Sequence, residues 1–360
     1  MEFVKQSAPH IKRKDNLMWM LLNVIIALAP TAIWAAVVTP LAALRIFPLA
    51  IATCLLCESL FVIITKKDPK AFKIENILSS IITGMIYGLC LPTEMSWDNG
   101  MGYVIVIFGA AIGIILGKLV FGGLGNNIFN PAALGMVVVR LFWGGFLSSS
   151  TASTGGFIDG SIVAGGTSLS YGATYSNIAN ADFLGMFLGR APGALGEGFH
   201  IAILVGLAYL LITRTIDWRV FVSYFGTFAV LMLVAGIVVQ TQLPTVNCGA
   251  FLLYQLLSGG ILFGAVFMIT DPVTGPMGGP NRVLFGIFGG FMVALIRIVL
   301  KTEGVAYSIL FANMIAPVLD YPSWSSSTWK KHHFISAGII GVFGILLVVL
   351  VLLFKKGAIA

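Results

Sequence analysis

Residues 17–38 read LMWMLLNVIIALAPTAIWAAVV, a stretch without a single charged side chain. A bilayer core of about 30 Å takes about 20 apolar residues in helical conformation, so this stretch predicts a transmembrane helix. Similar stretches recur along the chain, which has 58% hydrophobic and 10% charged residues. This composition excludes an ordinary water-soluble domain.

Eleven such segments are expected. Backbone polar groups find no water in lipid, and alternating strand patterns are absent, so helices are the spanning structure that this sequence supports. We therefore predict an all-α polytopic membrane protein with about ten core transmembrane helices and one extra C-terminal helix. The expected segments are residues 17–38, 46–65, 76–91, 102–121, 131–147, 199–213, 220–240, 250–270, 283–300, 304–319 and 334–354.

The basic residues predict the orientation, because cytoplasmic loops retain Lys and Arg. With residues 1–16 in the cytoplasm and the first helix retained rather than cleaved, 14 of the 21 basic residues fall on the inner side, and loop 148–198 is extracytoplasmic. The net charge of +7 is then a sign of topology, and charges divided among short loops do not favour nucleic-acid binding. The inner residues are Lys5, Lys12, Arg13, Lys14, Lys66, Lys67, Lys70, Lys73, Lys118, Arg214, Arg219, Arg282, Lys330 and Lys331.

The two halves of the chain are faintly similar. Ile107-Phe108-Gly109-Ala110 recurs as Ile287-Phe288-Gly289-Gly290, and the third to fifth segments match the eighth to tenth. Phe129 and Asn130 have near counterparts in Phe311 and Asn313, and residues 91–94 align with 268–271. A repeat of five helices must lie inverted in the membrane relative to its copy, as in many transporters. We expect residues 17–147 and 199–321 to form the two repeats, with residues 322–360 as a linker and an extra helix.

Two breaks interrupt the apolar pattern, at residues 122–131 and 270–276. Broken helices expose backbone groups and helix ends, so Asn130, Pro131, Thr270 and Asp271 are candidates for a central ion or ligand site. Asn130-Pro131 and Asp271-Pro272 are equally explained as helix N-caps followed by proline, and both interpretations can hold together.

Four spaced motifs resemble the family that contains the D subunit of Rnf electron-transport complexes and the B subunit of sodium-pumping NADH:quinone reductases. The short N-terminus favours the Rnf branch. The motifs are Ser7-Ala8-Pro9-His10, residues 122–132, Thr270-Asp271-Pro272-Val273, and residues 304–321.

The resemblance implies covalent FMN, attached through a phosphoester to a threonine in the outward loop. Gly172-Ala173-Thr174 matches the end of the family's flavinylation motif, whereas Ser168, Leu169 and Tyr171 depart from its start. Thr174 is the expected acceptor and Thr167 the alternative. Arg190 is a candidate for the flavin phosphate, with a solvated surface arginine as the commoner alternative.

Glu58 lies within the second expected helix, where an ionisable group implies a partner or a pathway. It is a candidate for cation handling or a structural salt bridge, and either Arg140 or Arg297 could neutralise Glu58 or a flavin phosphate. Cys54 and Cys57 share a helix face, but buried thiols that pack as small hydrophobes are commoner than metal sites. The sequence shows no nucleophile–base constellation and no metal-ligand spacing, so neither catalytic nor metal-binding residues are expected.

The resemblance implies a component of an ion-translocating ferredoxin:NAD oxidoreductase in a prokaryotic inner membrane, inactive alone. Its expected partners are the A, B, C, E and G subunits of the Rnf complex, a flavin transferase for maturation, and Na⁺ or H⁺ as the transported ion. The central residues would hold an ion or a second, noncovalent flavin such as riboflavin. The alternative is a stand-alone channel or transporter for a small solute, because an inverted-repeat bundle suits that function too.

Overall fold

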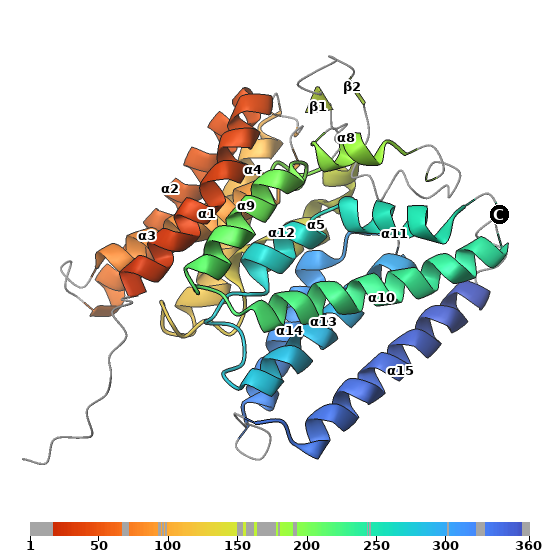
Figure 1. Ribbon diagram of the computed structural model, residues 1–360. Helices are drawn as coiled ribbons and strands as arrows, with labels where there is room; N and C mark the ends of the chain where they lie inside the picture. Colours follow the sequence, from red (N-terminus) through yellow and green to blue (C-terminus); the bar gives the residue numbers. More distant parts are fainter. Residues whose placement is uncertain are drawn as a thin grey trace, which may run out of the picture.

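Helices make up nearly all of the regular structure in the computed structural model of the chain (Figure 1). The only strands among the described residues are the two-residue pieces β1 (Thr154–Gly155) and β2 (Ile162–Val163), which pair antiparallel. The expected all-α polytopic membrane protein is thereby confirmed. The structure describes residues 17–66, 72–92, 95, 97, 99–149, 154–155, 162–163, 178, 181–189, 193–242, 244, 246–300, 302–321 and 328–354.

The main helices follow the apolar segments closely, and the first begins and ends where the sequence predicts. Several carry a π-helical turn or a break, which the apolar pattern alone does not show. They are α1 (Leu17–Val38), α2 (Pro40–Lys66), α3 (Ile74–Leu89), α4 (Met101–Ile114) with η2 (Ile115–Leu119), α5 (Pro131–Ser149), α9 (His200–Ile212), α10 (Trp218–Gln242), α11 (Cys248–Leu257), α12 (Ile261–Phe263) with η3 (Gly264–Met268), α13 (Gly279–Leu300), α14 (Val305–Leu319) and α15 (Lys331–Phe354).

The apolar helices differ in length. Six helices of the described chain are long and apolar enough to cross a membrane, and the number is seven if one bent pair counts as a span. That pair replaces the continuous helix expected at residues 250–270: the two parts, Cys248–Leu257 and Ile261–Met268, meet at 61°. Helices α3, α9, α14 and the apolar part of α5 have 10–17 residues. At 1.5 Å per residue they reach about 15–25 Å, less than the bilayer core of about 30 Å.

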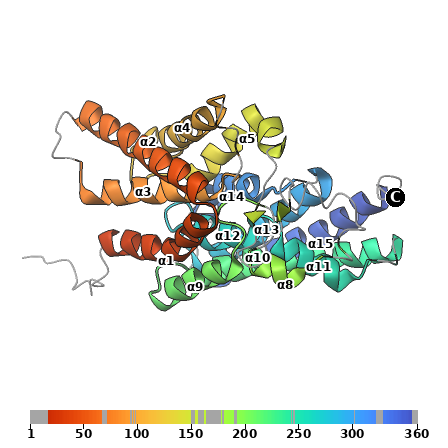
Figure 2. The same cartoon turned by 90° about the horizontal axis from the view of Figure 1, so that it is seen from above.

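Helices α1–α5 and α9–α14 form two neighbouring groups (Figures 1 and 2). Helix α1 packs against α9, and α5 packs against α14, so the joint between the groups is made by the first and last helices of each expected repeat. The repeat and its inverted orientation stay predictions. Asn130 and Asn313 do not hold equivalent places, because Asn130 precedes α5 whereas Asn313 lies within α14.

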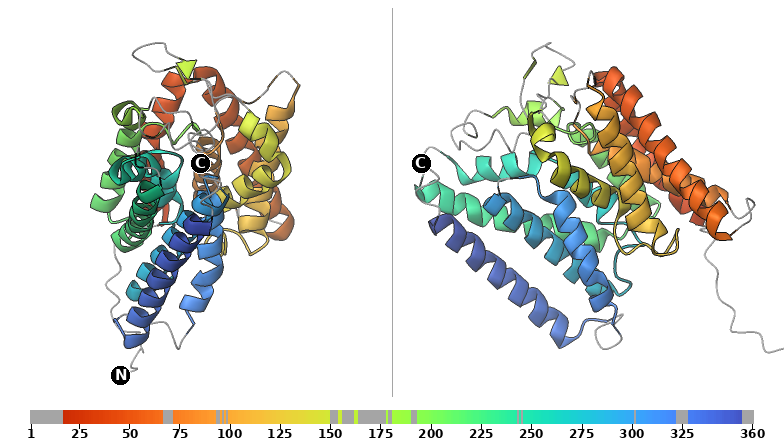
Figure 3. Two further views of the ribbon diagram at one scale, coloured as in Figure 1. Left: turned by 90° about the vertical axis from the view of Figure 1, so that its right-hand side faces the viewer. Right: turned by 180° about the vertical axis from the view of Figure 1, so that it is seen from behind.

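Helix α15 lies outside both groups and runs along α10 and α13 (Figure 3). Most of its surface is exposed. At its far end Gln242 Nε2 donates to the Leu352 carbonyl at 3.4 Å.

The last part of loop 148–198 closes over the first group of helices. Leu195 and Gly196 donate their backbone N–H groups to the carbonyls of Leu91 and Leu89, at 3.0 and 2.8 Å. A short helix, α8 (Phe183–Phe187), precedes this contact, and its first turn is capped by Asp182. The residues singled out for covalent flavin, Thr174 with Gly172 and Ala173, lie outside the described residues, as do Thr167 and Arg190.

Candidate functional site: a cavity between the two helix groups

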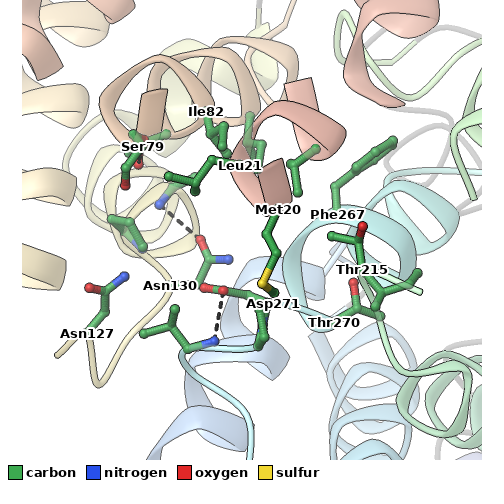
Figure 4. A pocket seen from close by; sticks show the side chains of 18 of the residues that line it. Met20, Leu21, Ser79, Ile82, Asn127, Asn130, Thr215, Phe267, Thr270 and Asp271 are labelled. Carbon is green, nitrogen blue, oxygen red and sulfur yellow. Dashed lines mark hydrogen bonds between the residues drawn. The ribbon is translucent and has the colours of Figure 1, made fainter. Parts of the chain in front are cut away.

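A cavity lies where the two broken segments meet (Figure 4). It is bounded by α1 and α3, by the loop before α5, and by η3 with the loop that follows it. Its volume is about 140 Å³, below the usual range of about 300–1,000 Å³ for small-molecule sites, so a larger ligand would extend through its open mouth. The sequence analysis named four of its lining residues: Asn130, Pro131, Thr270 and Asp271.

Each broken segment begins with a π-helical turn. Helix α4 passes into η2 and α12 passes into η3, and such turns occur frequently at functional sites. After η2 the backbone has positive φ at Gly122, Gly123 and Gly125, a conformation that glycine adopts without strain. The glycines therefore turn the chain back so that α5 starts at the cavity wall.

Asn130 is an N-cap and also joins the two helix groups. Its Oδ1 accepts from the backbone N–H groups of Ala132 and Ala133 at 3.0 and 3.2 Å, and Pro131 follows as the first helical residue. Its Nδ2 donates to the Met268 carbonyl, and its own backbone N–H donates to Asn313 Oδ1, both at 3.0 Å. The cap interpretation is confirmed here, and the same side chain lines the cavity.

Asp271 does not cap a helix, because α13 begins only at Gly279. The cap interpretation of Asp271-Pro272 is wrong. The Asp271 carboxylate instead stabilises a turn by accepting from the Val273 N–H at 3.1 Å and from the Thr274 hydroxyl at 3.4 Å. Burial raises the pKa of this carboxyl group above its usual value. Thr270 donates its hydroxyl to the Val266 carbonyl at 2.5 Å.

Asn127 carries the one cavity-lining polar atom that is buried without a partner among the described residues. Its Oδ1 accepts no hydrogen bond, and its side chain lies at the cavity opposite Thr270 (Figure 4). A buried acceptor without a donor costs about 1–3 kcal/mol, so this position calls for a ligand or water that donates. Apolar side chains from both groups form most of the remaining wall: Leu21, Val24, Ile82, Ile86, Val266 and Phe267.

Glu58 does not line this cavity. It forms a buried ion pair with Lys118 of η2, whose Nζ lies 2.7 and 2.6 Å from the two carboxylate oxygens. Ser80 donates its hydroxyl to Glu58, and Lys118 also donates to Ser79 Oγ at 2.9 Å. Since Ser79 lines the cavity, the Ser79 side chain lies between the ion pair and the cavity. Of the two alternatives for Glu58, the structure shows the salt bridge.

The structure corrects two expectations about charged residues. Lys118 was counted among the inner-side basic residues, but it is fully buried in η2 and is not one of the exposed charges that indicate orientation. Arg140 and Arg297 do not neutralise Glu58. They lie near Glu197 and Glu303 instead, which are far from Glu58 in the sequence. We name this buried group the carboxyl–arginine cluster; it consists of Glu197, Glu303, Arg140 and Arg297.

The carboxyl–arginine cluster stabilises the break between α11 and α12. Glu303 pairs with Arg140 and accepts from the Gly260 N–H at 2.9 Å. Arg297 donates to the carbonyls of Gln255, Ser258 and Glu303 at 2.7, 3.1 and 3.1 Å. These bonds satisfy backbone groups that the broken helix leaves unpaired. Arg297 also lies over the Phe228 ring, 4.9 Å from its centroid.

The two carboxyl groups of the cluster converge on Gly260. A Cβ atom there would lie 2.5 Å from Glu303 Oε1 and 2.7 Å from Glu197 Oε1. Burial and the neighbouring Glu303 raise the pKa of Glu197, whereas Arg140 and the hydrogen bond from Glu197 lower the pKa of Glu303 to about 2. Of the two carboxyl groups, Glu197 therefore takes up a proton first as the pH falls. Sequence reasoning missed both residues, and the only signal was that each precedes a glycine at the start of an apolar segment.

The described residues contain no group of three or more His, Cys, Asp or Glu side chains placed to hold a metal ion. Cys54 is buried, and its sulfur lies 3.9 Å from the Ala110 carbonyl oxygen, while Cys57 is half-buried. Both cysteines therefore lie in the packed helices without a ligand set around them.

The chain matches the family model described as the NQR2, RnfD, RnfE family over residues 4–328. It is similar to the B subunit of the Na⁺-translocating NADH-quinone reductase of Chromohalobacter salexigens, with 34% identity over 67% of this chain and 57% of that protein. It is also similar to the D subunit of the proton-translocating ferredoxin:NAD⁺ oxidoreductase complex of Clostridium ljungdahlii, with 28% identity over 88% and 93% of the two chains.

A third similar protein is the D subunit of an ion-translocating oxidoreductase complex from Stutzerimonas stutzeri, with 30% identity over 84% of this chain and 89% of that one. The matches to the quinone-reductase proteins of C. salexigens and Pseudomonas paraeruginosa span 57% and 58% of those proteins.

Proposed function

Since the chain belongs to the NQR2, RnfD, RnfE family, we propose that it is the membrane subunit of an Rnf-type ferredoxin:NAD oxidoreductase that couples electron transfer to translocation of Na⁺ or H⁺. Similarity over nearly the full length of two D subunits supports the Rnf branch. The chain would act with the A, B, C, E and G subunits of the Rnf complex in a prokaryotic inner membrane. NAD and ferredoxin would bind those partners.

The central cavity is the proposed site of a noncovalent flavin such as riboflavin. The observation that carries this proposal is the buried Asn127 Oδ1 in a cavity that is otherwise largely apolar. A flavin ring has apolar faces and an N–H donor at its edge, so it fits both features. When bound, a flavin accepts and donates electrons, which none of the side chains at the cavity can do.

The residues of this chain would bind the ring and exclude water from it. Leu21, Ile82 and Phe267 offer apolar contacts from three different elements, while Asn127 and Thr270 lie where polar edges can be recognised. Asn130 holds the wall in place through its bonds to Met268 and Asn313. Because these bonds join the two helix groups, the cavity keeps its shape only while both groups stay together.

Loop 148–198 is the proposed carrier of covalent FMN, attached to Thr174 by a flavin transferase. The family membership and the Gly172-Ala173-Thr174 sequence support this assignment. Arg190 is proposed to pair with the FMN phosphate. On the predicted topology this flavin lies at the outer face.

Glu58 is proposed to take part in cation handling through its pair with Lys118. The pair is buried, and Ser79 connects it to the cavity, so a change of charge in the cavity acts on it over a short distance. Glu58→Gln is expected to lower cation transport per electron in the assembled complex. Unchanged coupling in this variant would restrict Glu58 to a structural role.

Two measurements test the flavin assignments separately. On a denaturing gel of protein made with the flavin transferase, a fluorescent band should be present in wild type and absent in Thr174→Ala. A band that persists in Thr174→Ala and disappears in Thr167→Ala would move the acceptor to Thr167. A complex without any band would contradict covalent flavinylation.

For the cavity, flavin is released from the purified complex with acid and quantified. Asn127→Leu should lose most of the noncovalent flavin and keep the fluorescent covalent band. Asn76→Leu is the matched control, because Asn76 lies on α3 outside the cavity. Equal noncovalent flavin in Asn127→Leu and wild type would contradict the cavity assignment.

A further inference from the structure

A second hollow lies on the membrane-facing side of the molecule, between α10, α13 and α15. Its volume is about 780 Å³, compared with about 140 Å³ for the central cavity. We name it the α15 groove. Its walls are residues of all three helices together with Trp329, which precedes α15: Trp218, Arg219, Val222, Ser223, Gly226, Thr227, Val230, Leu231, Pro280, Val283, Ile287, Trp329, Ala337, Gly341 and Ile345.

The shape of the α15 groove follows from the two helices that flank it. Helices α10 and α15 touch at their C-terminal ends, where Gln242 bonds to the Leu352 carbonyl, and diverge toward their N-terminal ends (Figures 1 and 3). Gly226 of α10 and Gly341 of α15 both face open space, because a Cβ atom at either position would meet nothing within 4 Å. The groove is therefore wide at one end and closed at the other.

The wide end of the groove has the residues of a membrane interface. Trp218 and Trp329 lie there, both exposed, and tryptophan is enriched where the bilayer core meets the headgroups. Toward the closed end the walls become aliphatic, with Val230 and Ile345 as examples. The polarity of the groove thus changes along its length as the polarity of one bilayer leaflet does.

Positive charge gathers at the wide end. Arg219 is exposed, and one of its guanidinium nitrogens lies close to Gly279 at the start of α13. Its guanidinium carbon lies 6.0 Å from the centroid of the Trp218 ring. The nearby Asp217 carboxylate is already taken by Arg282, at 2.6 Å. Lys330 and Lys331 directly follow Trp329 and are exposed.

This charge pattern favours an anionic ligand in the groove. A guanidinium group is positively charged, and a helix N-terminus carries a partial positive charge. An anion between the two would stabilise both. An additional membrane helix fits less well, since its diameter of about 10 Å does not enter a groove that closes toward one end. Basic pockets between transmembrane helices are known sites for anionic lipid headgroups.

We propose that the α15 groove binds an anionic glycerophospholipid, with its phosphate at Arg219 and the start of α13 and its acyl chains between α10 and α15. The family match ends at residue 328, before α15 begins. Helices α10 and α13 of the site therefore lie within the family match, and α15 lies beyond it. Lipid binding gives α15 a role, which the electron-transfer function does not provide.

The test uses the complete complex, reconstituted with equal amounts of phosphatidylglycerol and phosphatidylcholine and then purified in mild detergent. Co-purifying lipid is quantified by mass spectrometry. Arg219→Gln should retain about fivefold less phosphatidylglycerol, the effect expected for one basic residue at a membrane surface, with phosphatidylcholine unchanged. Gly226→Leu/Gly341→Leu should fill the groove and lose the retained phosphatidylglycerol.

Gly338→Leu is the matched control for the filled groove. Gly338 is on α15, faces open space and does not line the groove, so this variant should retain lipid like wild type. Equal phosphatidylglycerol in Arg219→Gln and wild type would overturn the proposal. So would loss of another protein of the complex, rather than of lipid, from the filled-groove variant, because the groove would then be a protein–protein contact.

Discussion

Glu58 and Lys118 form one closed ion pair in the first helix group, whereas the carboxyl–arginine cluster places two acids and two arginines at a helix break in the second. The first pair has one charge of each sign, and its three Lys118 bonds go to Glu58 and Ser79. In the second, Arg297 bonds mainly to backbone carbonyls, and burial beside Glu303 raises the pKa of Glu197. In the first group, buried charges thus neutralise each other as a side-chain pair next to the cavity. In the second, they stabilise the backbone of a broken helix.

Removing one partner of the closed pair should have the largest effect. Lys118→Met leaves the Glu58 carboxylate buried without its cation, which costs about 3–5 kcal/mol of stability. The thermal midpoint of the detergent-solubilised protein measures this loss. The double variant Glu58→Gln/Lys118→Met should recover a large part of it, and a double variant as unstable as Lys118→Met would contradict the pairing.

Arg297→Lys should have the next largest effect. Lysine keeps the charge but loses the planar fork that reaches three carbonyls, and hydrogen bonds to charged groups contribute about 1.5–3 kcal/mol. Hydrogen exchange should rise at residues 255–260 in particular. If exchange rises equally throughout α13 and leaves the break protected, the arginine does not stabilise the break.

Ser79→Ala separates the ion pair from the cavity at a smaller cost. Lys118 keeps Glu58 and loses one hydrogen bond, for a net loss of about 1 kcal/mol. The thermal midpoint should fall slightly, while Ser59→Ala on the exposed side of α2 should leave it unchanged. A fall as large as that of Lys118→Met would mean that Ser79 is essential to the pair.

Glu197→Gln should have the smallest effect, because glutamine resembles the protonated acid. A raised pKa contributes stability that is present below the usual value of 4.5 and lost as the pH rises, whereas the lowered pKa of Glu303 contributes stability above 4.5 that is lost as the pH falls toward 2. The variant should therefore gain stability relative to wild type from pH 5 to pH 8.

Glu303→Gln provides the contrast within the same cluster. It removes the ionised partner of Arg140, so it should destabilise the protein at both pH values. Thermal midpoints at pH 5 and pH 8 compare the variants. A constant difference between Glu197→Gln and wild type would show that Glu197 does not change its protonation between these two pH values.

The helices could be predicted from sequence because length and apolarity decide them directly. Helix α1 begins and ends as expected, and α14 begins one residue later than expected. The break at residues 258–260 was missed because Ser258 and the two glycines after it hardly change the apolar pattern of the segment. Its cause is tertiary: Arg297 and Glu303 satisfy the backbone there, and both lie more than 35 residues away.

The candidate site was predictable in part for the same reason. Asn130, Pro131, Thr270 and Asp271 follow from the two interruptions of the pattern, and they do meet at one cavity. Asn127 was not singled out, because a partnerless side chain is visible only in three dimensions. Lys118 was counted with the inner-side charges because the charge bias treats every lysine as exposed, whereas Lys118 is buried in an ion pair with Glu58.

An experimental density map of the purified complex tests most directly whether the cavity between the two helix groups holds a noncovalent flavin. We predict planar three-ring density between Asn127 and Thr270, with a donor facing Asn127 Oδ1. A complex that contains noncovalent flavin, but whose map shows only water or side chains in this cavity and the flavin elsewhere, would contradict it.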